Sequence, residues 1–141
     1  MSGDIVTELL DQDLVLGTLA REAEECSEKN FHMAALACLF ILIEQAIKFA
    51  LNETKGNFHS LLILAKEKNL ISAEEFTMIN HLRQVRNKMF HESHYAWFNE
   101  ANGLFYQFSE DETKREIYDT FSRDCFNIVL KLISTPNPKF P

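Results

Sequence analysis

The residues of this chain that could do chemistry are concentrated in one short stretch, from His81 to His91. The stretch carries Arg83, Arg86 and Lys88 as well as the two histidines, and it contains no acidic residue. A guanidinium group can hold a phosphate through two parallel hydrogen bonds and stays charged at any working pH. An imidazole, whose unperturbed pKa is about 6.5, can take or give a proton near neutrality. Side chains of these types could bind a phosphate ester and move a proton beside it.

Helical periodicity places this stretch on a long helix that opens at Ser72-Ala-Glu-Glu75, which has the pattern of a capping box. At about 100° per residue, one face of the helix is apolar and consists of Met78, Leu82, Val85 and Met89. The polar side chains fall within an arc of about 140° centred opposite that face: Arg83, Arg86, Asn87, His91 and His94. We therefore expect the polar side chains to face away from the core.

The spacing within this arc allows some contacts and disfavours others. Arg83, Asn87 and His91 follow one another at intervals of four residues, so neighbouring pairs can touch. Arg86 and His91 lie at the two edges of the arc and would not touch on one straight helix. Both could flank a single phosphate if the helix bends or ends near His91, or if a second copy of the chain faces the first across a two-fold axis.

The remaining sequence predicts an all-α fold in which four to five helices form an up-and-down bundle. The second expected helix, about residues 31–51, is apolar nearly all round until Glu44, as expected of a central helix. Residues 94–108 should form either a short hairpin, with a turn at Asn102 and Gly103, or an aromatic loop. The expected helices cover about residues 4–28, 31–51 and 58–68, a segment that opens at residue 72, and a last segment that opens at Ser109-Glu-Asp-Glu112 and ends before Pro136.

Length and composition indicate one domain. The chain has 141 residues, of which 46% are hydrophobic and 25% charged, so residues 1–135 should form a single helical domain followed by a tail at 136–141. The longest uncharged apolar run, residues 33–43, falls short of the ~20 residues of a membrane span, and no secretion signal is visible. We therefore expect a cytoplasmic protein without a membrane partner. The three cysteines are widely spaced and should be reduced packing residues.

The charge of the chain is distributed unevenly. The formal net charge of −7 arises within residues 1–28, where eight acidic residues accompany a single base, Arg21. The rest of the chain carries equal numbers of acidic and basic side chains. The total charge thus does not exclude a phosphate ligand, although the acidic first segment argues against sequence-blind binding to long duplexes.

The motif Arg86-Asn-Lys-Met-Phe-His91 resembles the Arg, polar residue, short spacer and His signature of the HEPN superfamily (higher eukaryotes and prokaryotes nucleotide-binding domain). Residues 31–48 are similar to the second helix of that family, an apolar and small-residue run followed by an acidic residue, here Glu44. Residues 82–87 resemble the helix that leads into its motif. The likeness covers about residues 22–94.

The resemblance implies an all-α homodimer that is often a metal-independent RNA endonuclease of toxin, abortive-infection or other defence systems. By this likeness Arg86 would bind phosphate, Asn87 would orient, and His91 would be the acid or base, with the second histidine supplied by the other subunit. The ligand would be single-stranded RNA or a nucleotide, an antitoxin protein is a candidate partner, and neither a cofactor nor a metal is implied. Further residues are assigned to substrate binding (Arg83, Lys88, His94 and Tyr95) or to support of the site (Glu44).

These residues also have plainer interpretations. Many HEPN-like domains are inactive, so a non-catalytic dimer that binds a nucleotide, RNA or a protein is the alternative function. The basic residues could belong to a solvated face that pairs with Glu92 or with the acidic first helix, and Glu44 could be a partly buried partner of an arginine. His91 and His94 could share a metal ion, a hypothesis that we rank below the RNA one. The aromatic residues of 95–108 could stack on bases, although such a segment more often covers the end of a bundle or a dimer seam.

Overall fold

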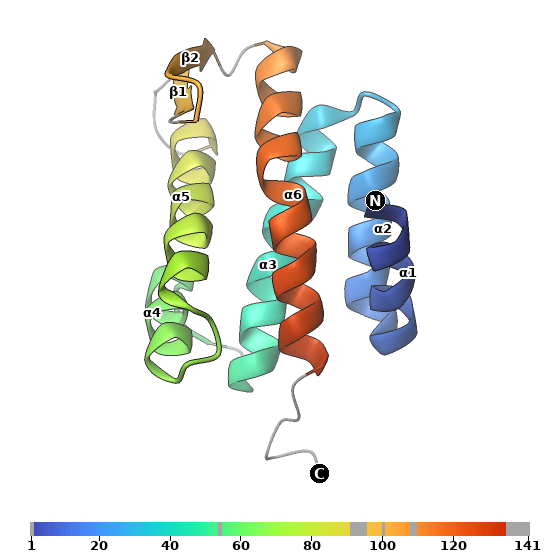
Figure 1. The fold of residues 1–141 in the computed structure, drawn as a ribbon, viewed down its shortest axis with the longest axis vertical. Helices are drawn as coiled ribbons and strands as arrows, with labels where there is room; N and C mark the ends of the chain where they lie inside the picture. The colour runs from blue at the N-terminus through green and yellow to red at the C-terminus, as the bar shows by residue number, and fades with distance from the viewer. Residues whose placement is uncertain (1, 54, 91–95, 100, 108–109, 135–141) are drawn as a thin grey trace.

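The computed structural model describes residues 2–53, 55–90, 96–99, 101–107 and 110–134 (Figure 1). Within these residues the fold is an all-α bundle with one small hairpin, which confirms the fold class expected from the sequence. The described residues contain six helices and two strands, in this order: α1 (Ser2–Gln12), α2 (Leu14–Glu28), α3 (His32–Leu51), α4 (Phe58–Glu67), α5 (Ala73–Phe90), β1 (Ala96–Asn99), β2 (Leu104–Gln107) and α6 (Asp111–Ser134).

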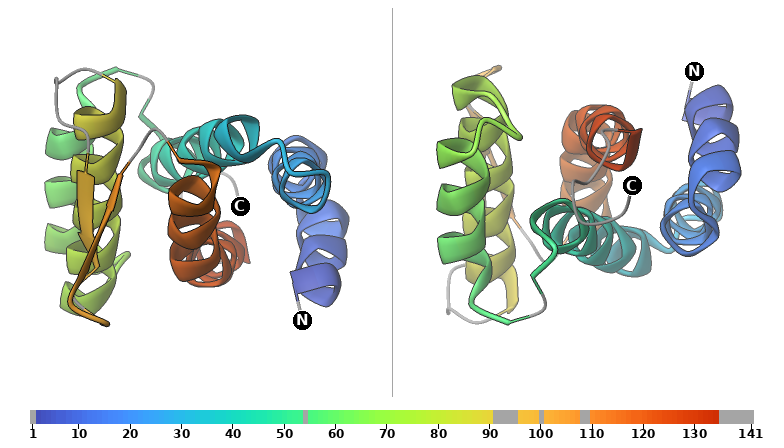
Figure 2. Two further views of the ribbon diagram at one scale, coloured as in Figure 1. Left: turned by 90° about the horizontal axis from the view of Figure 1, so that it is seen from above. Right: turned by 90° about the horizontal axis from the view of Figure 1, so that it is seen from below.

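The helices form three layers (Figure 2). α3 and α6 lie together in the middle, α1 and α2 cover one side, and α4 and α5 lie on the other side with the hairpin. α3 packs against α2, α4 and α6, so its buried side chains are the centre of the hydrophobic core. The central position predicted for this helix is confirmed, and α5 is carried at the edge of the bundle.

α3 is also long and apolar enough to cross a membrane, as judged by length and composition alone. Its mean hydropathy over the most apolar 18 residues is 1.9, and 44% of that stretch is buried inside the bundle. Core helices of soluble proteins pass the same test. α3 ends at Leu51, and the next residue, Asn52, caps it in the left-handed conformation with φ 54°, a geometry that Asn tolerates at a helix C-terminus.

The expectation of four to five helices was wrong because the first predicted helix is two helices. Asp13 has an extended backbone, with φ −152° and ψ 115°, and its side chain accepts a hydrogen bond from the Leu16 amide at 2.9 Å. This is the geometry of an N-cap, in which a short acidic side chain satisfies an amide that would otherwise lack a partner. The chain therefore turns at Asp13, and α1 folds back along α2.

Gly17 is required where α1 and α2 meet. A Cβ atom at this position would lie 2.5 Å from the Cα and amide nitrogen of Leu10, closer than real Cβ contacts. Replacing Gly17 by Ala should therefore lower the free energy of unfolding by about 2 kcal/mol, although Ala gains about 1 kcal/mol in helix propensity. Thermal unfolding monitored by circular dichroism would show the lowered Tm. Thr18→Ala on the same helix is the control, and an unchanged or raised Tm for Gly17→Ala would contradict the close packing.

The structure also bears on two other local predictions. Ser72 and Glu75 form the expected capping box: the Ser72 amide donates to Glu75 Oε1 at 2.8 Å, and the Glu75 amide donates to Ser72 Oγ at 3.0 Å. For residues 94–108 the sequence left a hairpin and an aromatic loop open, and the structure has antiparallel strands at 96–99 and 104–107, with the Leu104 amide donating to Asn102 Oδ1 and Gly103 at a φ of 71°. Ser109, which was expected to open the last helix, lies outside the described residues.

The last helix buries the side chains expected from its periodicity. These are Ile117, Phe121, Cys125, Ile128 and Leu132. Tyr118, on the same helix, donates a hydrogen bond to Glu24 Oε1 of α2 at 2.8 Å, which joins the middle layer to the α1–α2 layer. Burial, together with this bond to a carboxylate, raises the pKa of Tyr118 far above its usual value. The phenol therefore stays neutral, as a structural donor.

Candidate functional site

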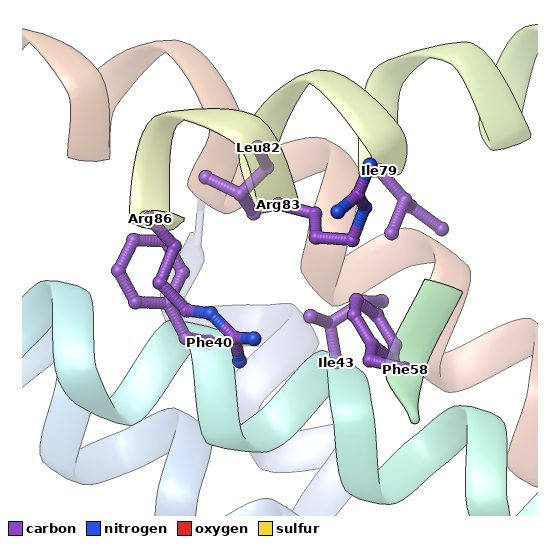
Figure 3. Close-up of a pocket in the computed structure, with 7 residues that line it drawn as sticks. All are labelled: Phe40, Ile43, Phe58, Ile79, Leu82, Arg83 and Arg86. Carbon is purple, nitrogen blue, oxygen red and sulfur yellow. The ribbon is translucent and has the colours of Figure 1, made fainter. Parts of the chain in front are cut away.

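Arg86 projects from α5 toward α3 and forms an ion pair there (Figure 3). Its Nη1 atom donates to Glu44 Oε1 at 3.3 Å. The guanidinium carbon also lies 5.9 Å from the centre of the Phe58 ring, within the range of a cation–π contact. Phe58 is held at the start of α4 because Asn57 caps that helix, accepting from the Ser60 amide at 2.8 Å. Three helices therefore fix the position of this arginine.

Glu44 is shared between two cations. Its second oxygen, Oε2, lies 3.2 Å from Lys48 Nζ, one turn further along α3. We call Glu44, Lys48 and Arg86 the Glu44 cluster. One carboxylate offset by two cations leaves the cluster with a formal charge of +1, which favours an additional anion. All three side chains are partly shielded from solvent, so the attraction is less screened than on an open surface.

The Arg86 guanidinium has unused hydrogen-bonding capacity. A guanidinium has five N–H donors, and within the described residues Arg86 makes one hydrogen bond, to Glu44. Its Nε atom is buried and has no hydrogen-bond partner in the part of the chain that the structure describes, and the Arg86 side chain lines a crevice between α5, α3 and α4. The crevice has room for about one water molecule, so no substrate group enters it. Since 26% of the Arg86 side chain is exposed, an anion must approach from outside.

The orientation of Arg86 differs from the expectation. The side chain was expected to face away from the core, but it packs against α3 and α4 together with Phe40, Phe58 and Ile79. Ile79 precedes Arg86 by seven residues, which is two helical turns, and its side chain is completely buried. The apolar face of α5 is therefore wider than the four predicted positions and extends underneath Arg86. Ile79 is the sequence signal that could have shown this.

Arg83 lines the same crevice as Arg86, but its hydrogen bond is made to another residue. Arg83 lies back along α5, and its Nε atom donates to Asn80 Oδ1 at 3.0 Å (Figure 3). No hydrogen bond between Arg83 and Asn87 is present among the described residues, although their spacing allows one. Asn87 is half-buried and Lys88 is exposed, so both can meet a ligand at the surface of α5.

Part of the predicted site lies outside the described residues. His91, His94 and Tyr95 all fall in the segment 91–95, and so does Glu92, an expected ion-pair partner. Among the residues that are described, no group of three or more potential ligands could hold a metal ion. The two arginines of α5 have hydrogen-bond partners other than Glu92: Arg86 bonds to Glu44, and Arg83 bonds to Asn80. Glu44 is the partly buried partner of an arginine, Arg86, and this pairing is compatible with a structural role as well as with support of the site.

An exposed stripe along α3 was not anticipated from the sequence. It consists of Ala34, Ala37, Ile41, Gln45 and Phe49, and we call it the α3 stripe. Ile41 is 48% exposed and Phe49 is 42% exposed, although both lie on the most apolar helix of the chain. The stripe borders Glu44 and Lys48 on the helix surface. The sequence does contain a signal for this stripe: apolar residues occur on every face of the α3 helix, and the other helices of a bundle of this size cannot cover every face.

Comparison of the chain with protein-family models, with curated proteins and with solved structures finds no match to any of them.

Proposed function

We propose that the protein is a HEPN-like, metal-independent endoribonuclease that acts as a homodimer on single-stranded RNA. The observation that carries the proposal is the Glu44 cluster, in which Arg86 is held by Glu44 and Phe58 and the formal charge is +1. A fixed guanidinium with free donors binds a phosphate without losing much side-chain entropy. Arg86 lies on the helix that leads directly into His91.

The proposed reaction is transfer of the phosphoryl group to the neighbouring 2′-oxygen of the same RNA strand. One histidine takes the proton of the 2′-hydroxyl while the oxygen forms a bond to phosphorus. The bond between phosphorus and the 5′-oxygen breaks, and a second histidine gives that oxygen a proton. The products are a 2′,3′-cyclic phosphate and a 5′-hydroxyl. Arg86 offsets the negative charge that develops on the phosphate oxygens.

Each chain supplies one His91, so this mechanism requires two chains. We propose that the α3 stripe is the dimer interface. It offers exposed Ile41 and Phe49 beside two alanines, which let a second helix approach closely, and it borders the Glu44 cluster. A two-fold axis through the stripe would bring one Arg86 side chain from each subunit to the edge of the same interface.

The proposal is tested with purified protein, labelled single-stranded RNA and excess EDTA. We expect cleavage that continues in the chelator and leaves cyclic-phosphate ends, whereas DNA of the same sequence stays intact because it lacks the 2′-hydroxyl. Cleavage that stops in EDTA would point to metal catalysis instead, and cleavage of the DNA would rule out attack by the 2′-oxygen.

A second candidate is a non-catalytic HEPN-like dimer that binds a nucleotide, RNA or a protein. It is favoured by the same ion pair, because an arginine that is 26% exposed, paired with Glu44 and packed on Phe58 also stabilises the contact of α5 with α3 and α4. In that case a stable dimer would bind labelled RNA or nucleotide without cleaving it.

A further inference from the structure

A groove between α5 and α6 lies away from the Glu44 cluster. It consists of two adjoining hollows of about 470 and 250 Å³, which share Glu74 and Met78. On α5 the groove runs from Ala73 to His81, about 12 Å or slightly more than two helical turns. α5 and α6 lie side by side with opposite chain directions in Figure 1. The groove residues of α5 project from the side of the helix that is turned away from α3 and α4.

The floor of the groove is apolar and fixed in place. Met78 contributes from α5, and Phe121 and Ile128 contribute from α6. Phe121 and Ile128 are seven residues apart, so their side chains follow each other at about 10 Å along the helix. The Phe121 ring meets the ring of His81 edge to face, with 5.4 Å between the ring centres. Side chains at positions i, i+3 or i+4, and i+7 lie on one face of a helix and span the same length, so a second helix could place them against these floor residues.

Each wall of the groove carries an exposed carboxylate. Glu74 lies on the α5 side and Asp124 on the α6 side. Glu75, by contrast, is neutralised by its ion pair with Lys131 at the end of the groove. Glu74 and Asp124 have no ion-pair partner among the residues that the structure describes. The two walls therefore present negative charge on both sides of an apolar floor.

We infer that the α5–α6 groove is a docking site for an amphipathic helix of a partner protein, with an apolar stripe bordered by Lys or Arg on both sides. The apolar stripe would cover Met78, Phe121 and Ile128, and the flanking cations would meet Glu74 and Asp124. Charge complementarity disfavours docking of α1 and α2 of a second copy, because these helices are the most acidic part of the chain and would bring more negative charge. The site is separate from the proposed RNA site.

The test uses two fluorescently labelled helical peptides of about 18 residues. Both have the same leucine stripe, and the flanking positions are Lys in one and Glu in the other. In fluorescence anisotropy titrations of the full chain, we expect the Lys peptide to bind about tenfold more tightly than the Glu peptide, with a preference that falls as salt is added. Equal affinities, or no binding of the Lys peptide, would overturn the inference.

Charge reversal locates the binding. In the double variant Glu74→Lys with Asp124→Lys we expect the preference to invert, so that the Glu peptide binds more tightly. The matched control is Glu8→Lys with Glu22→Lys, which changes the same charge on exposed positions of α1 and α2 and should leave both affinities within about twofold. A control that weakens Lys-peptide binding as much as the groove variant would show non-specific attraction and overturn the site.

A milder variant guards against loss of folding, since Glu74 is in the first turn of α5, where an acidic residue stabilises the helix. Glu74→Gln with Asp124→Asn should weaken binding of the Lys peptide about threefold and leave the Glu peptide unchanged or slightly tighter. Arg86→Lys should leave both affinities unaltered, which separates this site from the proposed RNA site. Unchanged Lys-peptide binding by the neutral variant would contradict the role of the walls.

Discussion

Replacing Arg86 by Lys, or His91 by Ala, is expected to lower the rate of RNA cleavage at least about 100-fold in each case. Lys at position 86 keeps a positive charge near Glu44, but it loses the planar fork that can hold a phosphate by two parallel bonds. Ala at position 91 removes the proton carrier from both subunits of a dimer. Single-turnover cleavage of labelled RNA in EDTA measures both rates. Because Arg86 and His91 act on the same phosphate, the double variant should lose little more than either single one.

Arg83→Lys is the matched control for this prediction. Arg83 lies on the same helix, one turn before Asn87, but its Nε atom donates to Asn80 and the side chain lies back along α5. We expect its replacement to change cleavage by less than about fivefold, as for a residue that adds only general attraction to the RNA. The catalytic assignment would be contradicted if Arg86→Lys cleaved at the normal rate, or if Arg83→Lys were as defective.

Replacing Ile41 by Glu is expected to convert the dimer into monomers and to remove cleavage with it. Ile41 is at the middle of the α3 stripe and is 48% exposed, so Glu is tolerated in the single chain. In a two-fold interface each substitution appears twice, and two unpaired carboxylates would be buried close together. Multi-angle light scattering should then give the mass of one chain, 16.4 kDa, instead of about twice that mass.

Leu14→Glu distinguishes the interface from exposed apolar surface in general. Leu14 is 72% exposed at the corner between α1 and α2, on the opposite side of α3 from α4 and α5. This variant should remain dimeric and active. The dimer interface would have to lie elsewhere if Ile41→Glu were still dimeric, and a wild-type chain that is monomeric at all concentrations would contradict the two-chain mechanism itself.

Local hydrogen bonds explain which predictions from the sequence succeeded. The capping box at Ser72 and Glu75 joins residues three apart, and the buried face of α6 repeats with the period of a helix. Such patterns depend only on neighbouring residues, so the sequence predicts them without knowledge of the fold. The N-cap at Asp13 is equally local and was predictable. The apolar spacing nevertheless continues from α1 into α2, so periodicity alone predicts one helix there.

The composition and periodicity of the chain thus determined by themselves an all-α bundle, the start of α5 and the central place of α3. Only the tertiary structure decided where Arg86 points, because its direction depends on Glu44, 42 residues away, and on Phe58 of another helix. The same holds for the α3 stripe and for the α5–α6 groove. A side chain on the edge of a helix is buried or exposed according to which helices lie beside it, and that arrangement results from the packing of the whole chain.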